Sequence, residues 1–169
     1  MVDHKLFRIL DRTLLALSAA ILAAIAGLTI VQVFYRYVLN NALSWSAELT
    51  RIGFIWMTFI GSAVAINRRR HLRIDSIIGL LSEKVRILLD VFVHVIVAAI
   101  MIFLTIRGYS LAVRAINTIT GALMWPRTVF FLPLVFGAFF MFVFSIRIIA
   151  EDVVKLRALK MKSDKEGEK

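Results

Sequence analysis

Cysteine is absent from the chain, and histidine occurs only three times among its 169 residues. Disulfide bonds, thiolate chemistry and cysteine-ligated metals are therefore excluded. Only His94 lies within a long apolar segment, so two axial haem ligands cannot meet inside this chain. No metal-ligand cluster, serine–histidine–aspartate order, phosphate-binding loop or pair of catalytic carboxylates can be identified either. The sequence predicts neither an enzyme nor a bound cofactor.

Hydrophobic residues, by contrast, make up 60% of the chain, and the mean hydropathy is +0.85. A soluble domain is only about half apolar, so this composition predicts a chain that has lipid as its solvent. The formal charge of +10 would also suit nucleic acid. However, the basic residues gather between long apolar runs, as they do in the loops of membrane proteins. We therefore expect no nucleic-acid partner.

Four apolar segments are long enough to cross a membrane as helices, which takes roughly 20 residues. Backbone polar groups in lipid must be satisfied internally, so all four are predicted to be α-helical. The first follows a basic start, as a signal peptide does, but its apolar stretch is too long and we expect it to be retained. The prediction is one all-α membrane domain over residues 1–169, with transmembrane helices at 14–35, 46–67, 87–106 and 128–149.

The basic residues indicate an orientation. They are concentrated before the first segment, between the second and third segments, and in the polar tail at 155–169. Because Lys and Arg favour the cytoplasmic side, we expect both termini and the middle connection in the cytoplasm of a bacterium, with the protein in its inner membrane.

The middle connection has a helical period of its own. Apolar residues recur at helical spacing over residues 72–84, with polar residues between them. This pattern favours a short amphipathic helix at the cytoplasmic interface, close to phospholipid head groups, although an ordinary turn is the alternative. The residues that we expect at this interface are Arg70, His71, Arg73 and Asp75.

Small residues recur every four positions on the first two helices. This spacing allows close helix packing in lipid, either within the chain or with a partner. The positions are Ala19, Ala23 and Gly27 on the first helix, and Gly61 and Ala65 on the second.

Two pairs of polar residues lie inside the predicted helices. Glu48 and Arg51 are three residues apart near the outer start of the second helix, so we expect a structural ion pair beside Trp45 in the interfacial belt. A part in transport is the alternative. Asp90 and His94 are four residues apart in the third helix, and a polar contact near the cytoplasmic interface is the favoured interpretation. A proton relay would need further titratable groups deeper in the bilayer.

Several short motifs resemble a known family. They read Arg-Tyr, then Trp-Ser-x-Glu-Leu, then His-x-x-x-Asp, and lie between Phe34 and Asp75. Gly121-Ala122-Leu123, Pro126, Pro133 and Gly137 add a looser likeness near the fourth helix. Together they resemble the small membrane subunit, the Q-type subunit, of TRAP (tripartite ATP-independent periplasmic) transporters.

The resemblance implies a function and two protein partners. In that family a large multi-span permease subunit carries the solute with sodium by an elevator movement, and the small subunit scaffolds it. A periplasmic solute-binding protein delivers a carboxylate such as sialic acid or a dicarboxylate. The short charged tail implies that the two membrane subunits are separate polypeptides. Arg36, Asn40 and Asn41 follow the first helix on the outer side, and we expect them either to dock the binding protein or to anchor to lipid phosphates.

Two other classes of protein remain open. A small dimeric exporter would need a carboxylate at the centre of a span, and Glu48 lies too near the end. A membrane anchor for a respiratory enzyme would need a second histidine within the membrane. Few polar groups, no inverted repeat and no broken helix favour an accessory subunit.

Overall fold

The structure is a computed structural model of the chain that describes residues 4–68 and 82–167. Each of its four helices contains a stretch long and apolar enough to cross a membrane. The prediction of an all-α protein with four membrane-spanning helices is therefore confirmed. The helices are α1 (His4–Tyr37), α2 (Ser44–Asn67), α4 (Glu83–Arg114) and α5 (Thr128–Gly167).

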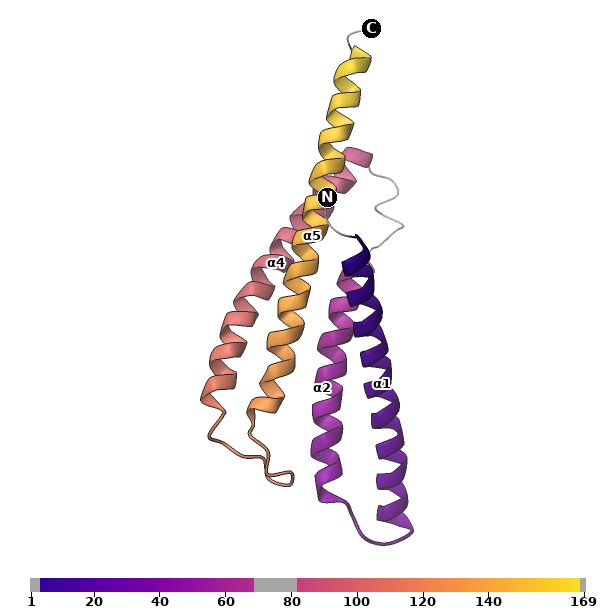
Figure 1. The fold of residues 1–169 in the computed structure, drawn as a ribbon, viewed down its shortest axis with the longest axis vertical. Coiled ribbons are helices and arrows are strands. Elements are labelled where there is room, and N and C mark those ends of the chain that lie inside the picture. Colours follow the sequence, from indigo (N-terminus) through magenta and orange to yellow (C-terminus); the bar gives the residue numbers. More distant parts are fainter. Residues whose placement is uncertain (1–3, 69–81, 168–169) are drawn as a thin grey trace.

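The four helices stand in a row rather than in a closed ring (Figure 1). Neighbours in the row are α1 with α2, α2 with α5, and α5 with α4. The row has two ends along its helices: the loop end, with the connections at 38–43 and 115–127, and the terminal end, where α1 begins and α5 ends. Because α1 and α4 each pack along most of their length on one neighbour, both expose long apolar surfaces, including Ile30 and Phe92.

All four helices extend beyond the apolar segments that hydropathy predicts. For example, α4 begins at Glu83 and α5 continues to Gly167 through most of the expected tail. Ion pairs along the helix support the polar part of α5: Arg147 with Glu151 at 2.8 Å, and Asp152 with Lys155 at 3.3 Å. Ion pairs three or four residues apart stabilise a helix in its polar part, and a hydropathy pattern does not detect them.

The predicted interfacial helix lies mostly outside the described residues. Of its range, only residues 82–84 are described, and Glu83 and Lys84 form the start of α4. The four residues expected at that interface, Arg70, His71, Arg73 and Asp75, also lie outside the described part, so this prediction stays a prediction.

The core of the row runs along the contact between α2 and α5. Ala63 of α2 and Ala138 and Phe144 of α5 are fully buried. The ring of Trp56 stacks on that of Phe136 with centroids 6.0 Å apart, and the ring of Phe7 from α1 reaches Phe144 at 6.1 Å. Aromatic pairs of this kind add to the packing of the three helices.

A glycine lies at each of the three helix contacts. A Cβ atom built on Gly53 would lie 2.9 Å from the side chain of Ile25, and one on Gly108 would lie 3.1 Å from Leu134. The closest approach is at Gly137, where a Cβ would lie 2.5 Å from the Cβ of Phe59 and 3.1 Å from its backbone carbonyl. A side chain can change its rotamer to avoid a clash, whereas the backbone of Phe59 cannot. The absence of a side chain at Gly137 therefore allows the short distance between α2 and α5.

Of the predicted small-residue positions, those on α2 pack within the row and those on α1 are exposed. Gly61 faces α1, with its Cβ position 3.6 Å from the hydroxyl of Ser18, and Ala65 is half-buried. In contrast, Ala19 and Ala23 are exposed, and nothing described lies within 4 Å of the Cβ position of Gly27. The small-residue face of α1 (Ala19, Ala23 and Gly27) therefore points away from the described helices, and its packing on a partner stays a prediction.

Replacing Gly137 by alanine should destabilise the fold, whereas the same change at Gly27 should not. The methyl group at position 137 meets the backbone of α2, and overpacking of this kind costs about 1–3 kcal/mol. Thermal unfolding of the purified variants in one mild detergent measures the difference. Equal stability of G137A and the unchanged protein would contradict the assigned contact.

Candidate functional site

The connection between α4 and α5 folds into a short hairpin at the loop end. The N–H of Thr120 donates to the carbonyl of Trp125 at 2.8 Å, and the N–H of Arg127 donates to that of Thr118 at 2.7 Å. The chain turns at Met124, whose φ of 54° is in the left-handed region. At the base of the hairpin, the Thr128 hydroxyl donates to the carbonyl of Ala112 at 2.8 Å.

Glu48 of α2 binds the tip of this hairpin. One carboxylate oxygen accepts the N–H groups of Gly121 and Ala122 at 3.0 and 3.1 Å, and the other accepts that of Leu123 at 2.9 Å. Successive backbone N–H groups that converge in this way form a concave site for an anion. The carboxylate lies in the second turn of α2, so the N-terminal end of the helix dipole favours it as well. We call this arrangement the Glu48 clasp.

The expected ion pair between Glu48 and Arg51 is not formed within the part of the chain that the structure describes. The reason is that the Glu48 oxygens bind three backbone donors instead, so both oxygens are occupied. Arg51 is exposed and lines a groove of about 280 Å³ together with Arg127, Phe130 and Phe131.

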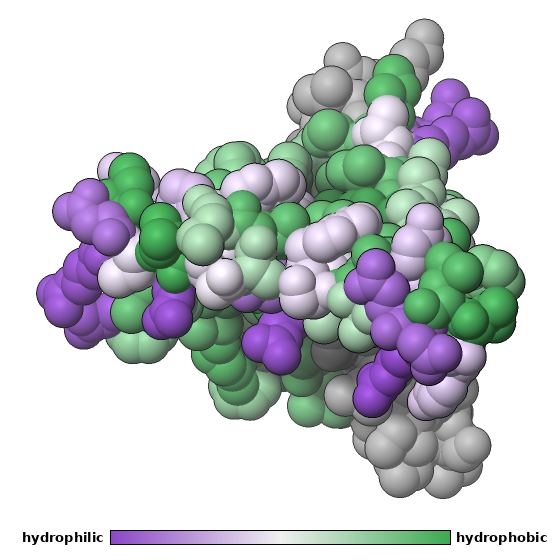
Figure 2. All heavy atoms as spheres, turned by 90° about the horizontal axis from the view of Figure 1, so that it is seen from below, coloured by the Kyte–Doolittle hydropathy of each residue, from purple (hydrophilic) through white to green (hydrophobic). Residues whose placement is uncertain are grey.

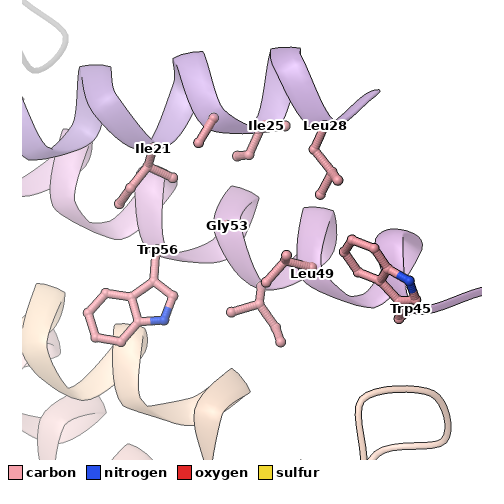
Figure 3. A pocket seen from close by; sticks show the side chains of 9 residues that line it. Ile21, Ile25, Leu28, Trp45, Leu49, Gly53 and Trp56 are labelled. Carbon is pink, nitrogen blue, oxygen red and sulfur yellow. The ribbon is translucent and has the colours of Figure 1, made fainter. Parts of the chain in front are cut away.

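Trp45 lies at a second, apolar groove between α1 and α2 (Figure 3). The groove has a volume of about 350 Å³ and lies beside the close contact of Gly53 with Ile25. Trp45 closes it near the loop end and Trp56 lies further along α2 (Figure 3). The position of Trp45 near the end of a spanning helix suits the predicted interfacial belt.

The other three residues predicted for the outer side lie together at the connection between α1 and α2. Arg36, Asn40 and Asn41 are all exposed. The guanidinium of Arg36 stacks 5.7 Å from the centroid of the Tyr37 ring, and the N–H of Asn41 donates to the carbonyl of Tyr35 at 3.1 Å. Seen from the loop end, hydrophilic residues form separate groups among hydrophobic surfaces (Figure 2).

A polar network that sequence reasoning missed joins three helices at the terminal end. Asp11 of α1 accepts a hydrogen bond from the Asn67 amide of α2 at 2.9 Å. The same carboxylate pairs with the guanidinium of Arg68, whose Nε and Nη2 donate to one oxygen at 3.0 and 2.8 Å. The Asn67 carbonyl in turn accepts a hydrogen bond from Arg147 of α5 at 3.2 Å.

Arg147 is held from two further sides. Its Nε donates to Glu151 at 2.8 Å, and its guanidinium lies 4.6 Å from the centroid of the Phe7 ring. The only signal in the sequence was the position of these polar residues at the edges of apolar segments, which does not indicate which helices they join.

The polar contact of His94 is with the backbone of Asp90. Nδ1 of His94 lies 2.7 Å from the Asp90 carbonyl oxygen. The two residues are therefore in contact near the start of α4, through the main chain of one and the side chain of the other.

In the part of the chain that the structure describes, the polar contacts given above that join one helix to another lie at the loop end and at the terminal end. Between these ends, the exposed side chains of the helices are mostly apolar. This architecture defines an integral membrane protein that presents packing surfaces to its surroundings. Residues 25–155 match the DctQ component of the tripartite ATP-independent periplasmic transporters. The chain belongs to this family, whose members are multi-pass proteins of the inner membrane.

Several characterised proteins are similar to the chain. Over 91 residues it is 34% identical to the sialic acid TRAP transporter permease protein SiaT of Haemophilus influenzae, a match that covers 54% of this chain and 15% of that protein. Over 98 residues it is 31% identical to the sialic acid TRAP transporter small permease protein SiaQ of Vibrio cholerae, covering 58% and 57%. A match of 30% over 70 residues to the C4-dicarboxylate TRAP transporter small permease protein DctQ of Vibrio cholerae covers 41% and 30%.

Replacing Glu48 by glutamine should release the tip of the hairpin. The amide has one acceptor oxygen where the carboxylate has two, and hydrogen bonds to a charged group are stronger than those to a neutral one. Amide hydrogen exchange at residues 121–123 should become faster by about tenfold or more. The matched variant R51Q should leave this exchange unchanged; faster exchange in both would show that Arg51 supports the clasp after all.

Asp11 and Arg68 should show energetic coupling. Their side chains are 13% and 35% exposed, so solvent screens the pair only partly. In a double-mutant cycle of D11N and R68Q, thermal unfolding should show that the double variant is less destabilised than the sum of the two single variants. The neighbouring exposed Arg12 offers a control, since R12Q combined with D11N should be additive. Additivity of both cycles would contradict the network.

Proposed function

We propose that this chain is the small permease subunit of a sodium-coupled TRAP transporter for a carboxylate solute, and that it scaffolds a large multi-span permease subunit. The open row of helices is the observation that supports this most directly. A closed bundle buries its apolar faces on itself, whereas α1 and α4 here expose theirs along most of their length. Such faces are available for packing against a second membrane protein.

The small-residue face of α1 is the surface that we assign to the large subunit. Ala19, Ala23 and Gly27 are exposed, one helical turn apart, and meet none of the described helices. Small residues at this spacing let two helices approach closely in lipid, where hydrophobic burial does not drive association. The names of the relatives support a carboxylate solute, since they refer to sialic acid and to C4-dicarboxylates.

Isolation of the tagged chain from its native membrane in mild detergent tests the proposal. A large multi-span membrane protein should be recovered in a near-equal amount and identified by mass. Recovery of the chain alone as a stable homodimer would overturn the proposal.

The variant G27L should reduce recovery of the large subunit but leave the folding of the chain unchanged, because no atom of the described residues lies within 4 Å of the Cβ position of Gly27. The matched variant A99L places the same side chain on the exposed face of α4 and should retain the partner. If G27L retained the large subunit and A99L lost it, the contact with the large subunit would be assigned to α4 instead.

We further propose that Arg36, with Asn40 and Asn41, helps to dock the periplasmic binding protein. An exposed charge at the loop end can steer the encounter of two proteins. Reversal of the charge in R36E should leave assembly intact and lower solute uptake at low ionic strength, on the order of tenfold. Unchanged uptake together with unchanged assembly would reduce Arg36 to a lipid anchor.

A further inference from the structure

The groove beside the Glu48 clasp has an unbalanced charge. Two guanidinium groups, Arg51 from α2 and Arg127 from the end of the hairpin, line it with one carboxylate, Glu48. Among the residues that the structure describes, the side chains of Arg51 and Arg127 form no ion pair, hydrogen bond or ring contact. Glu48 is engaged by backbone N–H groups. The groove therefore carries a net positive charge and two free sets of donors.

The position and lining of the groove restrict what neutralises this charge. Arg51 lies seven residues into α2, about 10 Å along its axis, and Arg127 directly precedes α5. Both are at the loop end of spanning helices, where head groups of the bilayer lie. The half-buried residues Phe130 and Phe131, which begin the apolar stretch of α5, also line the groove. The groove thus combines two cationic groups with two aromatic rings near the loop end.

We infer that this groove binds an anionic phospholipid, with its phosphate between Arg51 and Arg127 and the upper part of its acyl chains against Phe130 and Phe131. A phosphodiester carries one negative charge, which balances the net charge of the groove. Guanidinium groups donate paired hydrogen bonds to phosphate oxygens, which makes arginine well suited to this role. A carboxylate side chain of a partner protein would match the charge but not the two aromatic rings. The inference does not depend on the identity of the transported solute or of the large subunit.

Native mass spectrometry of the purified full-length chain, titrated with phosphatidylglycerol, tests the inference. One lipid should bind more tightly than the rest, and more tightly than phosphatidylcholine. The affinity for this lipid should fall about fivefold in R51Q or R127Q and about 25-fold in the double variant. The matched double variant R107Q/R114Q removes two exposed arginines of α4 near the same end but outside the groove, and should bind phosphatidylglycerol as the unchanged protein does.

Two further controls separate a lipid site from a folding defect and from an ion site. R51K/R127K keeps both charges and should retain most of the binding, so the test survives if the glutamine variants fail to fold. Inorganic phosphate at millimolar concentration should not displace the lipid; displacement would show an ion site in place of a lipid site. Equal lipid binding by R51Q/R127Q and R107Q/R114Q would overturn the inference. Loss of the large subunit in R51Q/R127Q with lipid binding unchanged would assign the groove to a protein interface.

Discussion

The contact between α2 and α5 holds the molecule together, because it is the main contact among the described helices that joins the α1–α2 pair to the α4–α5 pair. Phe7 of α1 adds a smaller one through Phe144 and Arg147 of α5. Gly137 lets the backbones of α2 and α5 meet in the middle of the main contact. The Glu48 clasp secures it near the loop end, and the hydrogen bond between Asn67 and Arg147 secures it near the terminal end. In lipid, where apolar burial does not distinguish a neighbouring helix from an acyl chain, steric fit and polar contacts of this kind must decide which helices pair.

The order of the main helix contacts, from α1 to α2 to α5 to α4, also explains why the helices form a row and not a closed bundle. Helices arranged in a ring would bury the apolar side chains that α1 and α4 expose in this row. Contacts at both ends and in the middle fix α2 on α5, while the outer faces of α1 and α4 stay uncovered. A surface fixed in this way suits the scaffolding role that we propose, since a scaffold has to keep its shape while its partner changes conformation.

Much of the fold could be predicted from the sequence, and much of the site could not. Hydropathy finds the four helices because a span needs about 20 consecutive apolar residues. It does not place the helix ends, because residues such as Arg147 and Glu151 continue α5 through ion pairs along the helix. Periodicity singles out Gly27 and Gly61 but passes over Gly53 and Gly137, which have no small residue four positions away in the sequence. Glu48 stands out as a charge in a span, but its partners lie 73 to 75 residues away and bind through their main chain.

The use of main-chain donors by the Glu48 clasp has a consequence for the variation of the hairpin among relatives. Hydrogen bonds from the N–H groups of residues 121–123 place no demand on the side chains of these residues, with proline as the exception because it lacks that donor. The tip can therefore diverge in size, charge and polarity while its attachment to α2 stays the same. Divergence at this tip would adapt one helical framework to different neighbours without altering how the framework itself is built.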